Sequence, residues 1–310
     1  VEIATVVWAA RLLGRPVKWT CTRSELMLSD AQARDHHTSA RMAFDRDGRI
    51  LGMEVDTLAN FGAYCSNFGP SIPGNSYPQT ITGLYRTPAL SLRVRGVYTN
   101  TVPIDAYRGS GRPEATLVNE RLLENGAREL GIDVVEMRRR NLVPKEAFPY
   151  KTPVGRVYDS ANPPALLDKL VEVSGYATLR EEQKRRRAAG ELVGIGHMLE
   201  CATADLDYAA GTFTVIGTNR SVSFEKVADA AYHGANCPTG PDFEPGLEAT
   251  VFYDPPDTND PSAMHLAMVS VDPRTWRVTI LGYYTADDAG TIVNPMIVEG
   301  QVHGGITQGI

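Results

Sequence analysis

The chain contains 310 residues, carries a formal net charge of −6, and is 43% hydrophobic and 22% charged. At about 150 residues per domain, this length predicts two domains, and the ordinary globular composition excludes collagen-like, coiled-coil and disordered proteins. The acidic balance without a long basic run argues against nucleic-acid binding. No apolar stretch reaches the roughly 18 residues that a membrane-spanning helix needs.

The chain ends and the cysteines bear on its compartment and on metal binding. The sequence starts without Met or a signal pattern and stops inside a patterned segment, so both ends are expected to be cut. No C-x-x-C motif is present, which argues against a zinc or iron–sulfur site made by this chain alone and favours a reducing, cytoplasmic compartment. The four cysteines are Cys21, Cys65, Cys201 and Cys237.

The first half of the chain predicts helices mixed with extended segments. Turn and cap signals set the bounds: Gly14 and Gly131 end helices, residues 45–48 (DRDG) turn a hairpin, and Asp133 with Glu136 opens a helix. The predicted elements are a helix over 1–13, a strand over 17–22, a hairpin over 37–59, a loop over 61–88, a strand over 92–101 and helices over 114–130 and 133–140.

The second half changes from helices to short strands near residue 192. Asn162 with two prolines opens one helix, and Thr178 with Glu181 reads as a capping box ahead of the basic run 183–187, which is interpreted as a solvated helix face. The predicted elements are helices over 162–173, 178–187 and 224–232, strands over 192–199, 211–216, 248–253, 265–271 and 277–284, and a turn over 272–275. Helices and antiparallel hairpins together predict an α+β fold.

The sharpest local motif is AYRGSGRPE at 106–114, between a predicted strand and a predicted helix. Gly109 and Gly111 allow positive φ, Pro113 suits a helix start, and Arg108 and Arg112 offer forked donors for phosphate or carboxylate. These features predict an anion-binding loop, while a tight turn with surface arginines remains an equal alternative. The motif lacks the third glycine of a dinucleotide fingerprint and the Gly-Lys-Ser/Thr of a P-loop, and it does not fit G-x-S-x-G.

A second motif, EGQVHGGITQG at 299–309, has helical apolar spacing but carries four glycines. Each interior glycine costs a helix up to about 1 kcal/mol relative to Ala, so the pattern indicates a close approach to the backbone. Gln301 and Gln308 offer amide hydrogen bonds to a heterocycle. Close packing against another helix is the alternative.

Other patterns are weaker. Residues 60–64 (NFGAY) favour a turn or bulge, and the acidic, proline-interleaved residues 254–260 favour a solvated loop over a calcium loop. The six histidines show no metal-ligand spacing, so no metal-binding residue is predicted.

Several long motifs in order carry a resemblance to a known family. They are 106–115 (AYRGSGRPEA), 129–133 (ELGID), 138–141 (RRRN), 287–290 (DDAG) and 294–305 (NPMIVEGQVHGG). Together they resemble the molybdenum-cofactor-binding large subunit of the xanthine dehydrogenase family, in its carbon monoxide dehydrogenase-like and isoquinoline 1-oxidoreductase-like branch. The resemblance extends over nearly the whole chain.

The resemblance implies an α+β protein made of two incomplete, mixed α/β cofactor-binding domains. The expected divisions are a first molybdopterin-binding domain over 1–145, connecting helices and the start of the second domain over 146–202, and part of the second molybdopterin-binding domain over 203–310. The implied cofactor is a molybdenum–pyranopterin, with or without a cytosine dinucleotide. The implied cofactor-binding residues are Ala106, Tyr107, Arg108, Gly109, Ser110, Gly111, Arg112, Gln301, Gly304, Gly305 and Gln308.

By the same resemblance, the function is hydroxylation or oxidation of a small organic substrate with oxygen from water. Electrons would leave through an iron–sulfur small subunit and an FAD medium subunit, and no iron–sulfur cluster is expected in this chain. Carbon monoxide dehydrogenases carry a copper-binding Cys where Gly109 stands, so no copper is expected. The substrate stays open.

Two further departures from the family bear on activity. A long stretch with a glycine–glutamine loop is missing near residues 202–204, and the catalytic Glu of a Gly-x-Gly-Glu motif is expected to lie beyond residue 310. The chain alone is therefore expected to be inactive and is interpreted as a truncated, internally deleted large subunit. The alternative is a non-catalytic remnant that keeps part of the pterin site or the partner surface.

Overall fold

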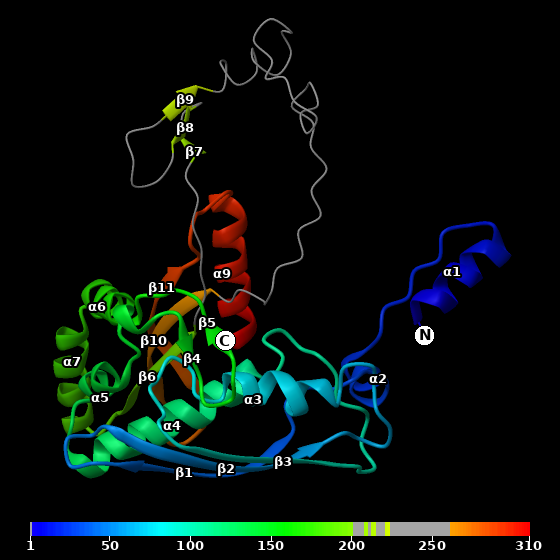
Figure 1. Cartoon of the computed structure of the whole chain (residues 1–310). Coiled ribbons are helices and arrows are strands. Elements are labelled where there is room, and N and C mark those ends of the chain that lie inside the picture. Colours follow the sequence, from blue (N-terminus) through cyan, green and yellow to red (C-terminus); the bar gives the residue numbers. More distant parts are fainter. Residues whose placement is uncertain (1, 201–207, 210–211, 215–220, 224–260) are drawn as a thin grey trace, which may run out of the picture. The chain divides into compact units, whose positions relative to one another are not determined.

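The computed structural model describes residues 2–200, 208–209, 212–214, 221–223 and 261–310 (Figure 1). The chain divides into two compact units: Val1–Leu142 with Thr152–Arg156, and Val143–Lys151 with Val157–Ile310. Both units mix helices with sheets, which confirms the predicted α+β class.

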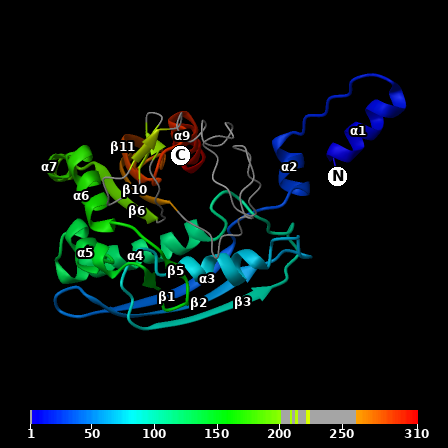
Figure 2. The same cartoon turned by 45° about the horizontal axis from the view of Figure 1, so that its top comes forward.

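The first unit contains one mixed sheet and its helices. Its elements are α1 (Glu2–Leu13), α2 (Arg23–Ser29), β1 (His36–Phe44), β2 (Ile50–Asn60), a π-helical turn (Ile72–Ser76), α3 (Tyr77–Thr80), β3 (Leu90–Val97), α4 (Arg112–Leu130) and α5 (Val134–Asn141). The sheet order is β1-β2-β3, with β1 antiparallel and β3 parallel to β2. The long helix α4 packs against β1, α3 and α5 (Figure 2).

The core of the first unit lies between the sheet and these helices. Alternate residues of a strand point to opposite faces, and Met53 and Val55 on β2 point inward. They cluster with Tyr77 and Ile81 from the α3 region and Ala115 on α4. This packing fixes the start of α4, and with it the loop that precedes the helix.

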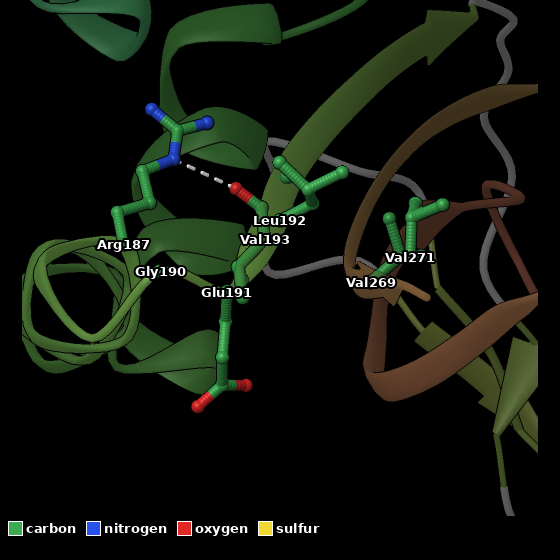
Figure 3. A pocket seen from close by; sticks show the side chains of 8 residues that line it. Arg187, Gly190, Glu191, Leu192, Val193, Val269 and Val271 are labelled. Carbon is green, nitrogen blue, oxygen red and sulfur yellow. Dashed lines mark hydrogen bonds between the residues drawn. The ribbon is translucent and has the colours of Figure 1, made fainter. Parts of the chain in front are cut away.

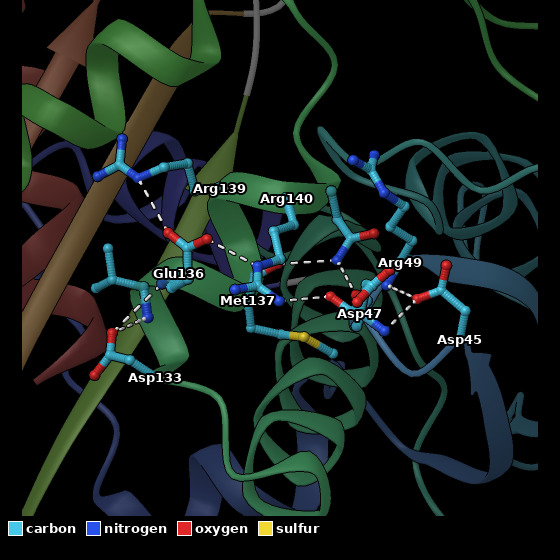
Figure 4. A network of polar contacts seen from close by, with 11 residues as sticks. Asp45, Asp47, Arg49, Asp133, Glu136, Met137, Arg139 and Arg140 are labelled. Atoms are coloured by element: carbon cyan, nitrogen blue, oxygen red, sulfur yellow. Dashed lines mark hydrogen bonds and ion pairs between the residues drawn. The ribbon is translucent and has the colours of Figure 1, made fainter.

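Helix α5 is tied to the turn of the β1–β2 hairpin (Figure 4). The side chain of Asn141 donates to the carbonyl of Gly48 at 2.7 Å and accepts from the amide of Ile50 at 2.8 Å. Arg140 donates to the carbonyl of Asp47 at 2.7 Å, and the Asp45 carboxylate accepts the amide of Arg49 at 2.8 Å. The predicted turn at residues 45–48 is therefore present and anchored.

A buried ion pair joins α4 to α5. Arg138 donates through Nε and Nη2 to Oε2 of Glu120 at 2.8 and 2.6 Å, and the Tyr85 hydroxyl donates to Oε1 at 2.6 Å. Burial raises the pKa of Tyr85 well above its usual value, so the phenol stays a donor. Removal of one partner from such a pair costs about 3–5 kcal/mol, because it leaves a buried charge unpaired.

The second unit contains an antiparallel sheet against which two helices pack. Its elements are a 3₁₀ turn (Lys145–Ala147), β4 (Tyr150–Lys151), β5 (Val157–Tyr158), α6 (Pro163–Ser174), α7 (Tyr176–Ala188), β6 (Leu192–Glu200), β7 (Tyr208–Ala209), β8 (Thr212–Thr214), β9 (Ser221–Ser223), β10 (Ser262–Val271), β11 (Val278–Asp288) and α9 (Pro295–Gly309). The main sheet has the order β11-β10-β6.

Side chains from a strand and a helix form much of the core of the second unit. Met264, Leu266 and Met268 on β10 are buried, and α6 contributes Leu167 and Leu170. Helix α6 packs on β10 and β11, and α7 packs on β6. The alternation along β10 buries one face of the sheet and leaves the other half-buried.

Three sequence-based expectations differ from the structure. Residues 17–22 form no strand, because Thr22 instead caps α2 in a capping box with Glu25. Helix α7 begins at Tyr176, directly after Gly175 at φ +58°, so Thr178 lies inside it and caps nothing. The expected loop over 61–88 contains the π-helical turn and α3.

Two predicted elements lie where the structure gives no description, and one further prediction concerns α7. The predicted helix over 224–232 and strand over 248–253 lie outside the described residues. The solvated basic face on α7 is confirmed for Lys184 and Arg185, whose exposed side chains pair with Glu181 and Glu182.

Candidate functional site

The loop at residues 106–112 is a tight double turn that leads into α4. The amide of Ser110 donates to the carbonyl of Tyr107 at 2.8 Å, and the amide of Arg112 donates to the carbonyl of Gly109 at 3.1 Å. Gly109, Ser110 and Gly111 have φ values of +96°, +40° and +92°. The sequence motif thus specifies three successive residues in the left-handed region, two of which are glycines.

The two glycines are required by the packing of the chain itself. A Cβ on Gly111 would lie 2.7 Å from the backbone nitrogen of Tyr77, and a Cβ on Gly109 would lie 2.7 Å from Cδ of Pro113. A side chain at either position would collide with atoms that cannot easily move. The tight-turn interpretation is therefore correct as far as the glycines are concerned.

The start of α4 has fewer free backbone N–H groups for binding an anion than the anion-binding interpretation of the motif predicts. Gly111 is the N-cap and provides no side-chain cap. The amide of Arg112 is used by Gly109, and Pro113 has no amide hydrogen. Two of the first three helical positions therefore cannot donate to an anion, although the positive end of the helix dipole still points toward the loop.

The crest of the loop, residues 106–108, is accessible to solvent, whereas the end of the loop that joins α4 is buried. Ala106, Tyr107 and Arg108 are exposed, with 46% of Tyr107 open to solvent, whereas Gly111 is buried. The backbone and side chains of residues 106–108 are therefore the part that a bound group can contact.

A polar cluster that the sequence did not reveal lies under this loop. It consists of Arg34, His36, Tyr77 and Glu114. Nε of Arg34 lies 3.9 Å from Oε2 of Glu114, and the rings of His36 and Tyr77 meet edge to face at 5.1 Å. The Tyr77 hydroxyl also shares a hydrogen bond of 3.1 Å with Oγ1 of Thr57. These residues come from three segments that are far apart in the sequence, so no local spacing indicates the cluster.

Burial shapes the electrostatics of this cluster. It lowers the pKa of His36, against the opposing effect of Glu114 and Asp35, and it raises the pKa of Tyr77. Oε2 of Glu114 and Nδ1 of His36 are buried atoms without a hydrogen-bond partner among the described residues. The loop therefore rests on polar groups that are only partly satisfied, which is more typical of a functional site than of a simple core.

The second predicted segment forms a regular helix. Helix α9 continues through all four glycines, and Asn294 caps it by accepting from the amide of Ile297 at 3.4 Å. Gln301, Gly304, Gly305 and Gln308 are spaced i, i+3, i+4 and i+7, so they line one face of α9. The two glutamines are exposed and the two glycines are half-buried.

The segment 60–64 has a structural role. The Asn60 side chain donates to Asp35 at 2.8 Å and accepts from the amide of Gly62 at 2.7 Å and from Oγ1 of Thr99 at 2.7 Å. It thereby ties the end of β2 to the residues just before β1 and just after β3. This agrees with the sequence-based preference for a turn.

The remaining polar clusters and hollows offer no second catalytic site among the described residues. Within the described residues, no group of three or more His, Cys, Asp or Glu side chains is placed to hold a metal ion, and no helix is long and apolar enough to cross a membrane. An open hollow in the second unit lies beside the end of α7 (Figure 3) and is lined by Leu192, Val193, Val269 and Val271, with Arg187 bonded to the Val193 carbonyl at 2.9 Å. Its lining is mainly apolar and includes no nucleophile.

Two models of protein families match most of the chain. Both are described as a molybdopterin cofactor-binding domain; one matches residues 1–142 and the other residues 169–310. The first match contains the loop at 106–112, and the second contains α9.

Individual relatives agree with these matches. The carbon monoxide dehydrogenase large chain of Hydrogenophaga pseudoflava is 29% identical over 97% of this chain and 52% of the relative. The 6-hydroxypseudooxynicotine dehydrogenase complex subunit gamma of Paenarthrobacter nicotinovorans is 27% identical over 100% of this chain and 52% of the relative. The crystal structure of quinoline 2-oxidoreductase from Pseudomonas putida 86 superposes with a TM-score of 0.75 at 25% identity, covering 98% of this chain and 53% of that one.

The chain spans about half the length of the curated relatives it matches. The first of these alignments extends over 421 positions, and this chain has only 310 residues, so at least 111 positions of the relative have no counterpart here.

Proposed function

The chain belongs to the xanthine dehydrogenase family of molybdopterin-binding proteins, and on this premise we propose that it forms the cofactor-binding part of a molybdenum hydroxylase that oxidises a small organic substrate. The observation that carries the proposal is the pair of molybdopterin cofactor-binding matches, each of which contains one of the two segments singled out by their glycines. When bound, the molybdenum–pyranopterin supplies the redox chemistry and the site for water-derived oxygen.

The residues present fit such a group in two respects. Residues 106–108 of the loop are exposed, and the polar cluster lies beneath them. Within that cluster, Oε2 of Glu114 makes no hydrogen bond among the described residues. Helix α9 presents two amide side chains and two glycines on one face, so a planar heterocycle can approach its backbone and be held by amide groups. We assign binding and orientation of the cofactor to residues 106–112 and to Gln301, Gly304, Gly305 and Gln308.

The proposal includes no copper. Any side chain at Gly109 needs a φ near +96° and a Cβ that lies 2.7 Å from Pro113. A metal-binding cysteine at this position is therefore incompatible with the turn as it stands, and the substrate is a small organic molecule rather than carbon monoxide.

The proposal further includes electron transfer to a separate iron–sulfur small subunit and an FAD medium subunit in the cytoplasm, and a cofactor that exists with or without a cytosine dinucleotide. No Gly-x-Gly-Glu motif occurs in the 310 residues, so the general base of the family is not supplied by this sequence. We propose that the chain alone has no turnover.

A non-catalytic remnant is the second candidate. The 111 or more unmatched positions inside the alignment favour it, because a pterin site that lacks part of its wall binds its cofactor weakly. Such a remnant would keep part of the pterin site or the surface for the partner subunits.

The test is to purify the chain from a host that makes molybdopterin, both alone and co-expressed with the products of its neighbouring genes. Molybdenum is measured by mass spectrometry, pterin by fluorescence after oxidation, and turnover by dye reduction. We expect the chain alone to contain little molybdenum and to reduce no dye, and the co-purified assembly to contain pterin. Complete absence of pterin from the assembly would refute cofactor binding, and near-stoichiometric molybdenum with steady dye reduction by the chain alone would refute both its inactivity and the remnant.

A further inference from the structure

The segment just before β1 runs parallel to residues 103–105, which lead into the loop. Gln32 forms a parallel bridge with Ile104, because its amide donates to the carbonyl of Pro103 at 2.9 Å and its carbonyl accepts from the amide of Asp105 at 2.8 Å. Asp35 is held on the other side, where its carbonyl accepts from the amide of Asn60 at 3.0 Å. The backbone is thus fixed at residues 32 and 35, and Arg34 lies between these anchors beside the loop.

Arg34 has an unusual backbone conformation for its residue type. Its φ is +61°, one of three positive values among the described non-glycine residues, and another of the three is Ser110 in the loop itself. Such a conformation persists only where the surroundings impose it, and it occurs preferentially at functional sites. Here the surroundings are the two anchors, and the result is that the side chain of Arg34 is directed at the loop.

One guanidinium group makes three different contacts there. Nη2 donates to the carbonyl of Arg108 at 2.5 Å, the guanidinium carbon lies 4.8 Å from the centre of the Tyr107 ring, and Nε lies 3.9 Å from Oε2 of Glu114. Only a planar, forked cation can bond a carbonyl, cover an aromatic face and face a carboxylate together; a lysine ammonium cannot. Glu114, in the first turn of α4, supplies the opposite charge from below.

We propose that Arg34 is the positioning residue of the cofactor loop: it holds the Arg108 carbonyl and the Tyr107 ring in place, so that the crest at 106–108 is ordered before a ligand binds. The role of the loop as a cofactor contact rests on the proposed function, but the restraint by Arg34 does not. Arg34 lies 74 residues from Arg108 in the sequence, so no motif could have indicated it.

The Arg108–Gly109 peptide bond provides a local probe. Trypsin cuts after arginine only where several residues can become extended, so cleavage there measures how often the turn opens. The full chain is treated with trypsin, and the peptide ending at Arg108 is followed by mass spectrometry in wild type, Arg34→Met and Arg34→Lys. Arg41→Met is the matched control, because Arg41 does not contact the loop. It forms an exposed ion pair with Glu54, in which Nη2 and Oε2 lie 2.6 Å apart.

We expect Arg34→Met to raise the initial cleavage rate at Arg108 by about tenfold, Arg34→Lys by less, and Arg41→Met not at all, while cleavage elsewhere and the melting temperature stay close to wild type. A local increase of this kind is not produced by a general loss of stability. An unchanged rate at Arg108 in Arg34→Met, or an equal rise at every site, would overturn the proposal.

Pterin content of the co-purified assembly is the second readout. We expect Arg34→Met to lower it at least severalfold and Arg41→Met to leave it unchanged. If wild-type assembly contains no pterin, the proposed function fails while the trypsin result still decides the role of Arg34. If wild-type assembly contains pterin but cleavage at Arg108 is the same in all variants, the positioning role fails alone.

Discussion

The loop at 106–112 and helix α9 are both rich in glycine, but the glycines have different structural roles in the two segments. In the loop, Gly109 and Gly111 have positive φ and a Cβ on either would collide with Pro113 or Tyr77. In α9, Gly300 and Gly309 are helical, and a Cβ on either would meet no atom within 4 Å. The loop therefore needs its glycines to fold, whereas α9 has no such need at these two positions.

This difference matters for function. Glycines that the fold requires say little about a ligand, since any tight turn of this shape would select them. Glycines that weaken a helix without a packing reason indicate that something outside the described residues approaches the backbone. Gly300, which lies one helical turn before Gly304, therefore supports our proposal of a bound group at α9, and the loop is the stronger evidence for a rigid support.

The largest expected effect is in the loop. Gly111→Ala places a Cβ 2.7 Å from the Tyr77 nitrogen at φ +92°, so we expect it to lower the free energy of unfolding by about 3 kcal/mol. Urea denaturation followed by circular dichroism measures this.

Gly155→Ala is the matched control for Gly111→Ala. Gly155 lies in the same unit at φ +91°, but nothing lies within 4 Å of its added Cβ, so only the cost of the conformation, about 1 kcal/mol, is expected. Equal losses in both variants would show that the close contact with Tyr77 contributes nothing.

Gly109→Cys is expected to have the next largest effect, a loss of about 2 kcal/mol, because the new Cβ meets the ring of Pro113. We also expect the variant to bind no copper, since the side chain cannot be accommodated without rearranging the turn. Copper measured after dialysis against Cu(I) decides this, and Gly155→Cys serves as the control for adventitious binding by an exposed thiol. Stoichiometric copper in Gly109→Cys alone would contradict the proposed exclusion.

In α9 the sign of the effect reverses. Gly305→Ala lies on the face shared with Gln301 and Gln308 and should stabilise the helix by up to about 1 kcal/mol, whereas His303→Ala, at an exposed position on the opposite face, is the control. We expect only Gly305→Ala to lower the pterin content of the co-purified assembly. If both variants keep full pterin, the face at Gln301, Gly304, Gly305 and Gln308 is not a cofactor contact.

Local signals predicted most elements, because they act through neighbouring atoms. Asp133 accepts from the amide of Val135 at 2.9 Å at the start of α5, and Gly131 closes α4 at φ +66°, as their positions in the sequence indicated. The T-x-x-E pattern is less reliable: Thr22 with Glu25 forms a capping box where the sequence predicts the end of a strand, whereas Thr178 with Glu181 does not cap α7. The first and fourth residues are the same in both segments, but the helix begins at a different place relative to them: Thr22 is the N-cap of α2, whereas Gly175 is the N-cap of α7.

Contacts between distant segments could not be predicted in this way. The parallel pairing of β2 with β3 joins strands separated by the whole π-helical and α3 region, and the cluster of Arg34, His36, Tyr77 and Glu114 draws on three distant segments of the chain. The loop itself could be found from its glycines and arginines, but its support could not. The polar cluster under the loop is therefore the part of the candidate site that only the structure reveals.

The smallest expected effect is a pH dependence of the free energy of unfolding, which arises from His36 in the polar cluster under the loop. Burial lowers the pKa of His36 in the folded chain, so the unfolded chain, with a pKa near 6.5, binds the proton more readily. Stability is therefore fully present above about pH 6.5 and falls as the pH drops through the lower folded pKa. Glu114 and Asp35 oppose this shift, and solvent around the half-buried ring weakens it. We expect the loss of unfolding free energy between pH 7.5 and pH 5 to be smaller in His36→Gln than in wild type, with His37→Gln, at an exposed position on β1, as the control. The same loss in all three proteins would show that His36 does not couple the loop support to pH.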